Sequence, residues 1–289
     1  MDGVVISIAS IVIGFFVGIL SGLLGIGGGT VMVPTFRLLF GMSAISSTAT
    51  SLFAIVPTSI SGAVSHVRQK TCIPALGLAC GIGGALTSPL GVWLADNSPG
   101  WAIMLATGLV VAWSATSMLR KAAKMKPAPA AKAAEPAPAA EAVEPAPTAE
   151  AAEPAPAAAP EDVRLTKRQL LTGVGIGMLA GVMSGYVGVG GGFLMVPLML
   201  SLIHINMNKA SGTSLIAVMI LAVPGVIEQM VLGNVNYVAG ISIVVGTIPG
   251  AVVGARLVRI VPERTLRFIF GVFLLFVAVI LVVTELGLL

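Results

Sequence analysis

Residues 21–34 read SGLLGIGGGTVMVP, and residues 184–197 read SGYVGVGGGFLMVP. Nine of the fourteen positions are identical at a constant offset of 163 residues. Each copy places three consecutive glycines and a later proline inside an apolar segment, where both residue types weaken a helix. The repeated interruption decides the fold, because it predicts two related halves that each contain a broken helix.

The composition is that of an integral membrane protein. Of the 289 residues, 56% are hydrophobic and only 10% are charged, and the mean hydropathy is +1.02. A water-soluble domain carries more charge than this. The N-terminal segment lacks the basic region and cleavage site of a secretory signal, so we expect it to remain as the first membrane helix. The bilayer is therefore an expected partner, and a nucleic acid is not.

Apolar segments follow the same order in both halves. In the first half they are residues 4–24, 31–40, 47–65, 73–94 and 101–119, and in the second half 170–189, 193–203, 210–230, 237–255 and 267–284. Most approach the roughly 20 residues that a helix needs to cross a bilayer, but the two segments that follow the glycines are too short. One straight helix over residues 4–40 would be roughly 55 Å long, so the chain must turn at the glycines. We expect an all-α polytopic membrane protein in which each half is a broken-helix hairpin followed by three transmembrane helices.

The halves are joined by a stretch that can form neither a core nor a membrane span. Residues 127–160 alternate Ala, Pro and Glu in nine-residue units such as AAEPAPAAE, which favours an extended polyproline II chain. We divide the chain into a first membrane repeat (residues 1–120), a disordered cytoplasmic linker (121–168) and a second membrane repeat (169–289).

The Lys and Arg residues predict how the halves are oriented. A hairpin returns to its starting side and three spans follow it, so the second half should be inverted relative to the first. Cytoplasmic loops carry the excess of Lys and Arg. With the linker ends inside, Arg68 and the cluster at 256–267 also fall inside, whereas Asp96 and Glu228 fall outside and Arg37 is the basic exception. We expect inverted-topology repeats in the inner (plasma) membrane.

Two stripes of small residues recur every four positions in the first helix of each half. They are Ser10, Gly14, Gly18 and Gly22, and Gly173, Gly177, Gly181 and Gly185. Such stripes let helix backbones approach closely, so we expect them to pack helices rather than to bind a ligand.

The motif glycines are candidates for an anion site. Unwound backbone is tolerated at membrane depth only where it is buried or lines a cavity. The short helix after each triplet presents free amides and a positive dipole end, and we expect the two loops to meet near the midplane. The predicted substrate-binding residues are Gly25, Gly27, Gly28, Gly29, Thr50, Ser51, Gly188, Gly190, Gly191, Gly192, Thr213 and Ser214.

Each part of this site has a structural alternative. The glycines could merely permit tight packing, and the hydroxyls could bond to the preceding helical turn. Glu228 is the carboxylate inside a predicted span and hence the candidate for proton coupling, with interfacial solvation as its alternative. The sequence offers no nucleophile–base pair or metal cluster, and Cys72 and Cys80 read as small packed hydrophobes. We expect neither an enzyme nor a bound metal or cofactor.

The doubled motif, GLLGIGGGTVMVP and GYVGVGGGFLMVP, each followed by TSL, resembles the sulfite exporter TauE/SafE family of membrane permeases. The resemblance covers both membrane halves but not the linker. It implies a secondary transporter that exports small sulfur-containing anions, such as sulfite or organosulfonates, across the inner membrane. An importer of small carboxylates and a membrane scaffold acting through the linker stay open as alternatives, as does a homo-oligomer.

Overall fold

The computed structural model describes residues 3–124 and 166–285, and every regular element within them is a helix. The first half contains α1 (Gly3–Leu24), α2 (Gly29–Phe40), α3 (Ala44–Arg68), α4 (Pro74–Asp96) and α5 (Gly100–Lys124). The second half contains α6 (Lys167–Val187), α7 (Gly192–Leu198), the π-helix η1 (Met199–Ile203), α8 (Met207–Val231), α9 (Tyr237–Leu257) and α10 (Glu263–Glu285). Most of the predicted linker, residues 125–165, lies outside the described residues.

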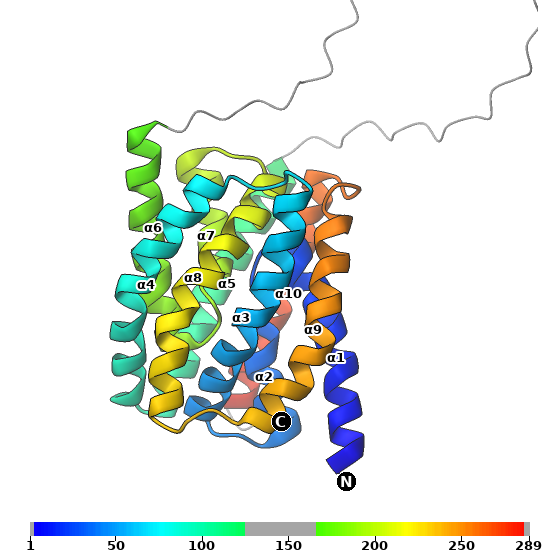
Figure 1. The fold of residues 1–289 in the computed structure, drawn as a ribbon, viewed down its shortest axis with the longest axis vertical. Coiled ribbons are helices and arrows are strands. Elements are labelled where there is room, and N and C mark those ends of the chain that lie inside the picture. The colour runs from blue at the N-terminus through cyan, green and yellow to red at the C-terminus, as the bar shows by residue number, and fades with distance from the viewer. Residues whose placement is uncertain (1–2, 125–165, 286–289) are drawn as a thin grey trace, which may run out of the picture.

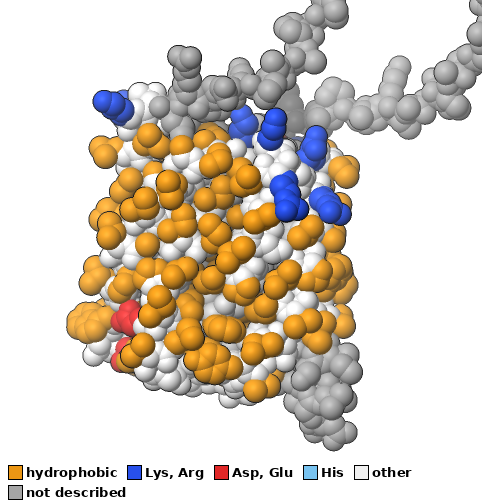
Figure 2. Space-filling model, in the orientation of Figure 1, with side chains coloured by type: hydrophobic (Ala, Val, Ile, Leu, Met, Phe, Trp, Pro, Cys, Tyr) orange, Lys and Arg blue, Asp and Glu red, His pale blue; other side chains and the backbone are white. Residues whose placement is uncertain are grey.

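The helices present an apolar surface of the kind that lipid requires. Six of them, namely α3, α4, α5, α6, α8 and α9, are long and apolar enough to cross a membrane. Hydrophobic side chains cover most of the face drawn in Figure 2, while Lys and Arg gather at the end where α5 and α6 meet the linker. Because a solvated protein rarely exposes so large an apolar patch, this surface belongs in a bilayer and the protein is multi-pass.

The first helix of each half ends where its glycine triplet predicts a break. α1 ends at Leu24 and α2 begins at Gly29, and α6 ends at Val187 where α7 follows from Gly192. The residues just before α2 and α7 are Gly28 and Gly191, with φ of 87° and 68°. Only glycine adopts this left-handed backbone readily, so the triplets start a new helix in a new direction.

The offset of 163 residues also holds for the bounds of the elements. α3 and α8 have the same length of 25 residues and correspond at this offset from end to end. α2 corresponds to α7 and η1 together, with one difference: the second copy changes from an α-helix to a π-helix at Met199.

The first helix of each half packs against a helix of the other half. α1 lies along α9, and α6 lies along α4. A Cβ atom added at Gly18 would overlap the carbonyl oxygen of Thr247, and one added at Gly181 would overlap that of Gly84, which is the corresponding position. The close backbone approach predicted from the small-residue stripes is therefore confirmed, and it joins the two halves to each other.

The direction of the chain differs between the corresponding helices. α5 ends and α6 begins at the same end of the molecule, which we call the linker end (Figure 1). α1 runs toward the linker end, whereas α6 runs away from it (Figure 1).

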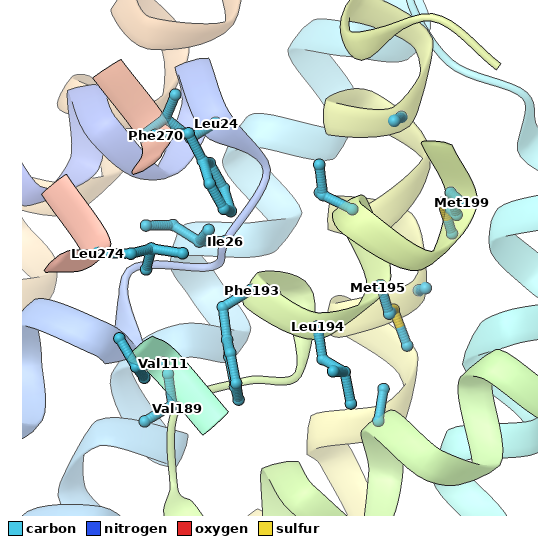
Figure 3. Packing of buried hydrophobic residues seen from close by; sticks show 14 of the residues in the cluster. Leu24, Ile26, Val111, Val189, Phe193, Leu194, Met195, Met199, Phe270 and Leu274 are labelled. Atoms are coloured by element: carbon cyan, nitrogen blue, oxygen red, sulfur yellow. The ribbon is translucent and has the colours of Figure 1, made fainter. Parts of the chain in front are cut away.

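The two helix breaks lie in the hydrophobic interior. Figure 3 shows Ile26 of the first loop beside Phe270 and Leu274, and Val189 of the second loop beside Val111 and Phe193. These residues belong to one buried cluster to which α5 and α10 contribute, so that pair of helices covers the loops. The unwound backbone is thus shielded from lipid, as its polar groups require.

Candidate functional site

The structure brings the two glycine motifs into direct contact. A Cβ atom at Gly29 would lie 2.6 Å from the backbone of Val189, and one at Gly192 would lie 2.8 Å from the Cα atom of Ile26. Ile26 and Val189 are fully buried. Glycine is therefore required at these two positions for packing alone, and the loops meet as the sequence predicts.

Four amides of the two loops have no hydrogen-bond acceptor among the described residues. Among the hydrogen bonds formed by residues 3–124 and 166–285, none is donated by the amides of Gly27, Gly28, Gly190 or Gly191. Buried amides without a partner are rare in proteins, because each one loses its bond to water. Amides at the start of a helix suit the oxygen atoms of an anion, so these four are candidate donors to a ligand.

Buried hydroxyls without a partner lie around the same loops. The Oγ atom of Ser59 is 3.3 Å from the position that a Cβ atom on Gly27 would take, and the Cβ atom of Ser21 is 3.6 Å from the equivalent position on Gly28. The unpartnered hydroxyls of the loops, of the helices that enter and leave them and of α3 include Ser21, Thr30, Ser51, Ser59 and Ser184. A hydroxyl without an acceptor can donate its proton to a bound anion.

Sequence reasoning found only Ser51 of these five hydroxyls. Ser21 and Ser184 open the two copies of the motif and are identical in both, so the repeat itself was a signal for them. Ser59 carries no such signal, because the corresponding residue is Ala222. Its place beside Gly27 follows from the crossing of α3 and the loop, which only the structure gives.

Ser214 is attached to the first loop. Its Oγ atom donates to the carbonyl oxygen of Gly25 at 2.7 Å. A Cβ atom on Gly25 would lie 2.6 Å from the Cα atom of Ser211, and one on Gly188 would lie 2.5 Å from that of Thr48. Gly25 and Gly188 therefore let the loops pack tightly on α8 and α3.

The two predicted threonines have structural partners. Thr50 Oγ1 accepts a hydrogen bond from the amide of Asn236 at 2.9 Å, and Thr213 Oγ1 accepts one from the amide of Ile73 at 2.9 Å. Asn236 and Ile73 are the residues that precede α9 and α4. Thr213 also donates to Lys209 O in the preceding helical turn. These contacts favour the structural alternative for both threonines.

Glu228 lies far from the glycine loops. It follows Ser214 by fourteen residues on α8, which is about 21 Å along the helix axis. Its Oε2 atom is buried and makes no hydrogen bond to any described residue. The structure therefore leaves proton coupling by Glu228 as a prediction, separate from the anion site.

Other polar groups of the spans are occupied by structural contacts. His66 is fully buried, with Nε2 2.8 Å from Gly22 O and Nδ1 2.8 Å from Thr71 Oγ1. In the described ranges, no three His, Cys, Asp or Glu side chains are grouped closely enough to hold a metal ion. The arrangement of described residues is suited to holding an anion with neutral donors.

Known proteins that resemble this chain are membrane transporters. A family model described as sulfite exporter TauE/SafE matches residues 10–281. The probable membrane transporter protein YdhB of Bacillus subtilis (strain 168) is 28% identical over 261 residues, which cover 89% of this chain and 92% of YdhB. The probable membrane transporter protein YunE of the same strain is 26% identical over 276 residues, covering 92% of this chain and 94% of YunE. No solved structure matches the chain.

The family match spans both helical halves. Both relatives are named as probable membrane transporters, and each aligns with this chain over nearly its whole length. With its apolar helices and its two interrupted ones, the chain is a membrane transporter that belongs to the sulfite exporter TauE/SafE family.

Proposed function

We propose that this transporter exports small sulfur-containing anions, such as sulfite or organosulfonates, and that the two glycine loops hold the substrate. The observation that carries the proposal is the meeting of two buried loops whose amides lack acceptors. The amides of Gly27, Gly28, Gly190 and Gly191 would bind the anion's oxygens. The hydroxyls of Ser21 and Ser51 would donate to it as well.

Neutral donors suit a substrate that must also leave. A buried Lys or Arg would bind an anion strongly, whereas amides and hydroxyls offer partial charges only. In the conformation described, the loops touch at Gly29 and Gly192, so the anion would enter as they separate. The same donors fit a carboxylate, and the name of the matching family favours sulfite.

We infer that the two halves insert in opposite orientations, with the linker end in the cytoplasm and the protein in the inner membrane. The opposite directions of α1 and α6 support this arrangement (Figure 1). So does the concentration of Lys and Arg at the linker end (Figure 2). Rocking of one half against the other would then expose the loops to each side in turn.

Transport by the purified full chain in proteoliposomes tests the proposal. Labelled sulfite should exchange against unlabelled sulfite and sulfonates, and more slowly against small carboxylates. Ser21→Ala and Ser51→Ala should each lower sulfite kcat/KM by roughly ten-fold or more, because each removes a hydrogen bond to a charged group.

The matched control is Ser88→Ala. Ser88 is also buried and without a described partner, but its Oγ atom on α4 lies beside Gly225 of α8, which is not a loop glycine. Its loss should leave transport within two-fold of wild type. Equal transport by Ser21→Ala, Ser51→Ala and wild type would refute the assigned site, and exchange against carboxylates alone would refute the assigned substrate.

A further inference from the structure

A basic groove opens between α3 and α9 at the linker end. Its volume is about 840 Å³, within the usual range for small-molecule sites. The polar side chains that line it, which we call the arginine groove, are Ser61, Ser65, Arg68, Gln69, Arg256 and Arg259. α3 belongs to the first half and α9 to the second, so both halves build the groove.

The positive charge of the groove is not balanced by the described residues. None of the three arginines Arg68, Arg256 and Arg259 forms an ion pair or a side-chain hydrogen bond with a described residue. Arg267, by contrast, is paired with Glu263 at 2.6 Å. Three guanidinium groups around one cavity, with no counter-charge among the described residues, repel one another, and an oxyanion with several oxygens would relieve that repulsion.

The groove also supplies neutral donors. Gln69 Nε2 donates to Ser65 Oγ at 3.0 Å, so the proton of the Ser65 hydroxyl is left for another acceptor. Ser65 is buried at the inner wall, whereas the arginines are exposed at the mouth. A ligand would therefore meet charge first and a directed hydroxyl behind it.

Comparison of the two halves shows that the fold does not require these arginines. At the offset of 163 residues, Arg256 corresponds to Trp93 and Arg259 to Asp96. Arg68 corresponds to Val231, and Ser65 to Glu228. The tendency of basic residues to lie on the cytoplasmic side explains why these arginines lie at the linker end. It does not explain why they converge on a cavity that is also lined by hydroxyls.

Polar side chains lie along α3 between the groove and the first glycine loop. Ser61 Oγ donates to Ile248 O at 2.9 Å, and one turn further inward Thr58 pairs with Thr247. Ser59, whose buried hydroxyl has no partner, follows beside Gly27. From Ser65 to Ser59 the distance along α3 is only about 9 Å.

We propose that the arginine groove binds an oxyanion group (sulfite, sulfonate or phosphate) and serves as the vestibule from which anions reach the glycine loops. The vestibule role rests on the proposed function, whereas oxyanion binding does not. The same chemistry is presented by a free anion and by the headgroup of an anionic lipid. The experiment therefore has one arm for each source.

The free-anion arm measures binding of radiolabelled sulfite, and separately of inorganic phosphate, to the full chain in neutral detergent at low salt. The lipid arm compares phosphatidylglycerol with phosphatidylcholine by native mass spectrometry. The test variant is the double substitution Arg256→Gln and Arg259→Gln. The control is Lys167→Gln with Arg168→Gln, which removes the same charge from exposed positions at the linker end of α6.

The test variant should weaken oxyanion binding at least ten-fold, and the control should change it less than two-fold. Loss confined to free anions supports the vestibule, and loss confined to phosphatidylglycerol supports a headgroup site in the same groove. Equal effects of the two double variants, or no binding by wild type in either arm, would overturn the proposal.

Sulfite transport separates a failure of this inference from a failure of the proposed function. The groove variant should raise KM with the maximal rate within two-fold, because capture is impaired and the central site is intact. Groove binding in a protein that moves no sulfite would leave the groove standing and reject sulfite as the transported anion. An unchanged KM in the groove variant would reject the vestibule.

Discussion

Glycine has two separate roles in this chain. In α1 and α6 it removes side chains so that carbonyl oxygens of α9 and α4 can approach, and in the loops it frees the backbone from helical geometry. Gly18 belongs to the first group and Gly28 to the second. Both roles allow close packing, but only the second shapes the loops of the proposed site.

Gly18→Ala should destabilise the protein by about 1–3 kcal/mol, since the added methyl overlaps the Thr247 carbonyl and forces two backbones apart. Thermal unfolding in detergent measures the effect. Gly175→Ala is the control, because Gly175 lies on α6 with open space around it. A Gly18→Ala protein as stable as Gly175→Ala would mean that α1 and α9 do not pack as described.

Glu228→Gln tests proton coupling apart from anion binding. If the carboxyl carries the proton, the variant should lose the acceleration of sulfite transport by a pH gradient but keep exchange in the absence of a gradient. Asp96→Asn serves as the comparison, since it removes a carboxylate from the last turn of α4. Gradient-driven transport at the wild-type rate by Glu228→Gln would assign the residue to interfacial solvation.

Single residues were predictable where the repeat marked them. The motif glycines lie at the loops because local backbone chemistry places them there, whereas the bond from Ser214 to Gly25 joins residues 189 positions apart. The structural role of Thr50 could not be predicted from the sequence, because its hydrogen bond to Asn236 joins residues 186 positions apart. The convergence of Arg68 with Arg256 has the same origin, since it depends on which helices pack together.

Among the helices, the π-helix η1 is a difference between the two halves, because the corresponding part of α2 is α-helical. Pro197 has no N–H to offer Phe193 O, and that oxygen instead accepts from Ser114 Oγ of α5 at 2.6 Å. Lys121, also on α5, donates to Pro197 O at 3.2 Å and to Ser201. α5 therefore supplies the donors that hold α7 and η1 in place.

Lys121→Met should lower the free energy of unfolding by about 1.5–3 kcal/mol, because a charged donor is withdrawn from partly buried acceptors. Chemical denaturation in detergent micelles gives the difference. Arg120→Met, at the neighbouring exposed position, should stay within about 0.5 kcal/mol of wild type. Equal stability of both variants would show that η1 does not depend on α5.

The sequence predicted the bounds of the helices more accurately than it predicted how the helices pack. Hydropathy and the glycine triplets place the ends of α1 and the start of α2 within a few residues. The change from α7 to η1 was not predicted, because Pro34 and Pro197 occupy the same position in both motifs and only one is followed by a π-helix. The small-residue stripes predicted close approach but could not name the partner helix.

For the whole molecule, a change in the linker distinguishes a transporter from a scaffold that acts through the linker. Replacing residues 127–160 by a Gly/Ser sequence of equal length should leave sulfite transport within two-fold of wild type. Every contact of the loops and the groove described above is made by residues outside this segment. Transport in proteoliposomes measures the first outcome, and loss of a cellular phenotype with transport intact would favour a scaffold that uses the linker.

The pairing of α1 with α9 and of α6 with α4 has a consequence for synthesis. Between Leu24 and Tyr237 the ribosome adds 213 residues, which takes about 10–40 s at 5–20 residues per second. Throughout that interval the glycine-lined side of α1 lacks the helix against which it packs in the finished protein. The two halves can therefore pair fully only after α9 has been synthesised, and a nonsense mutation upstream of Tyr237 would leave α1 without its partner helix.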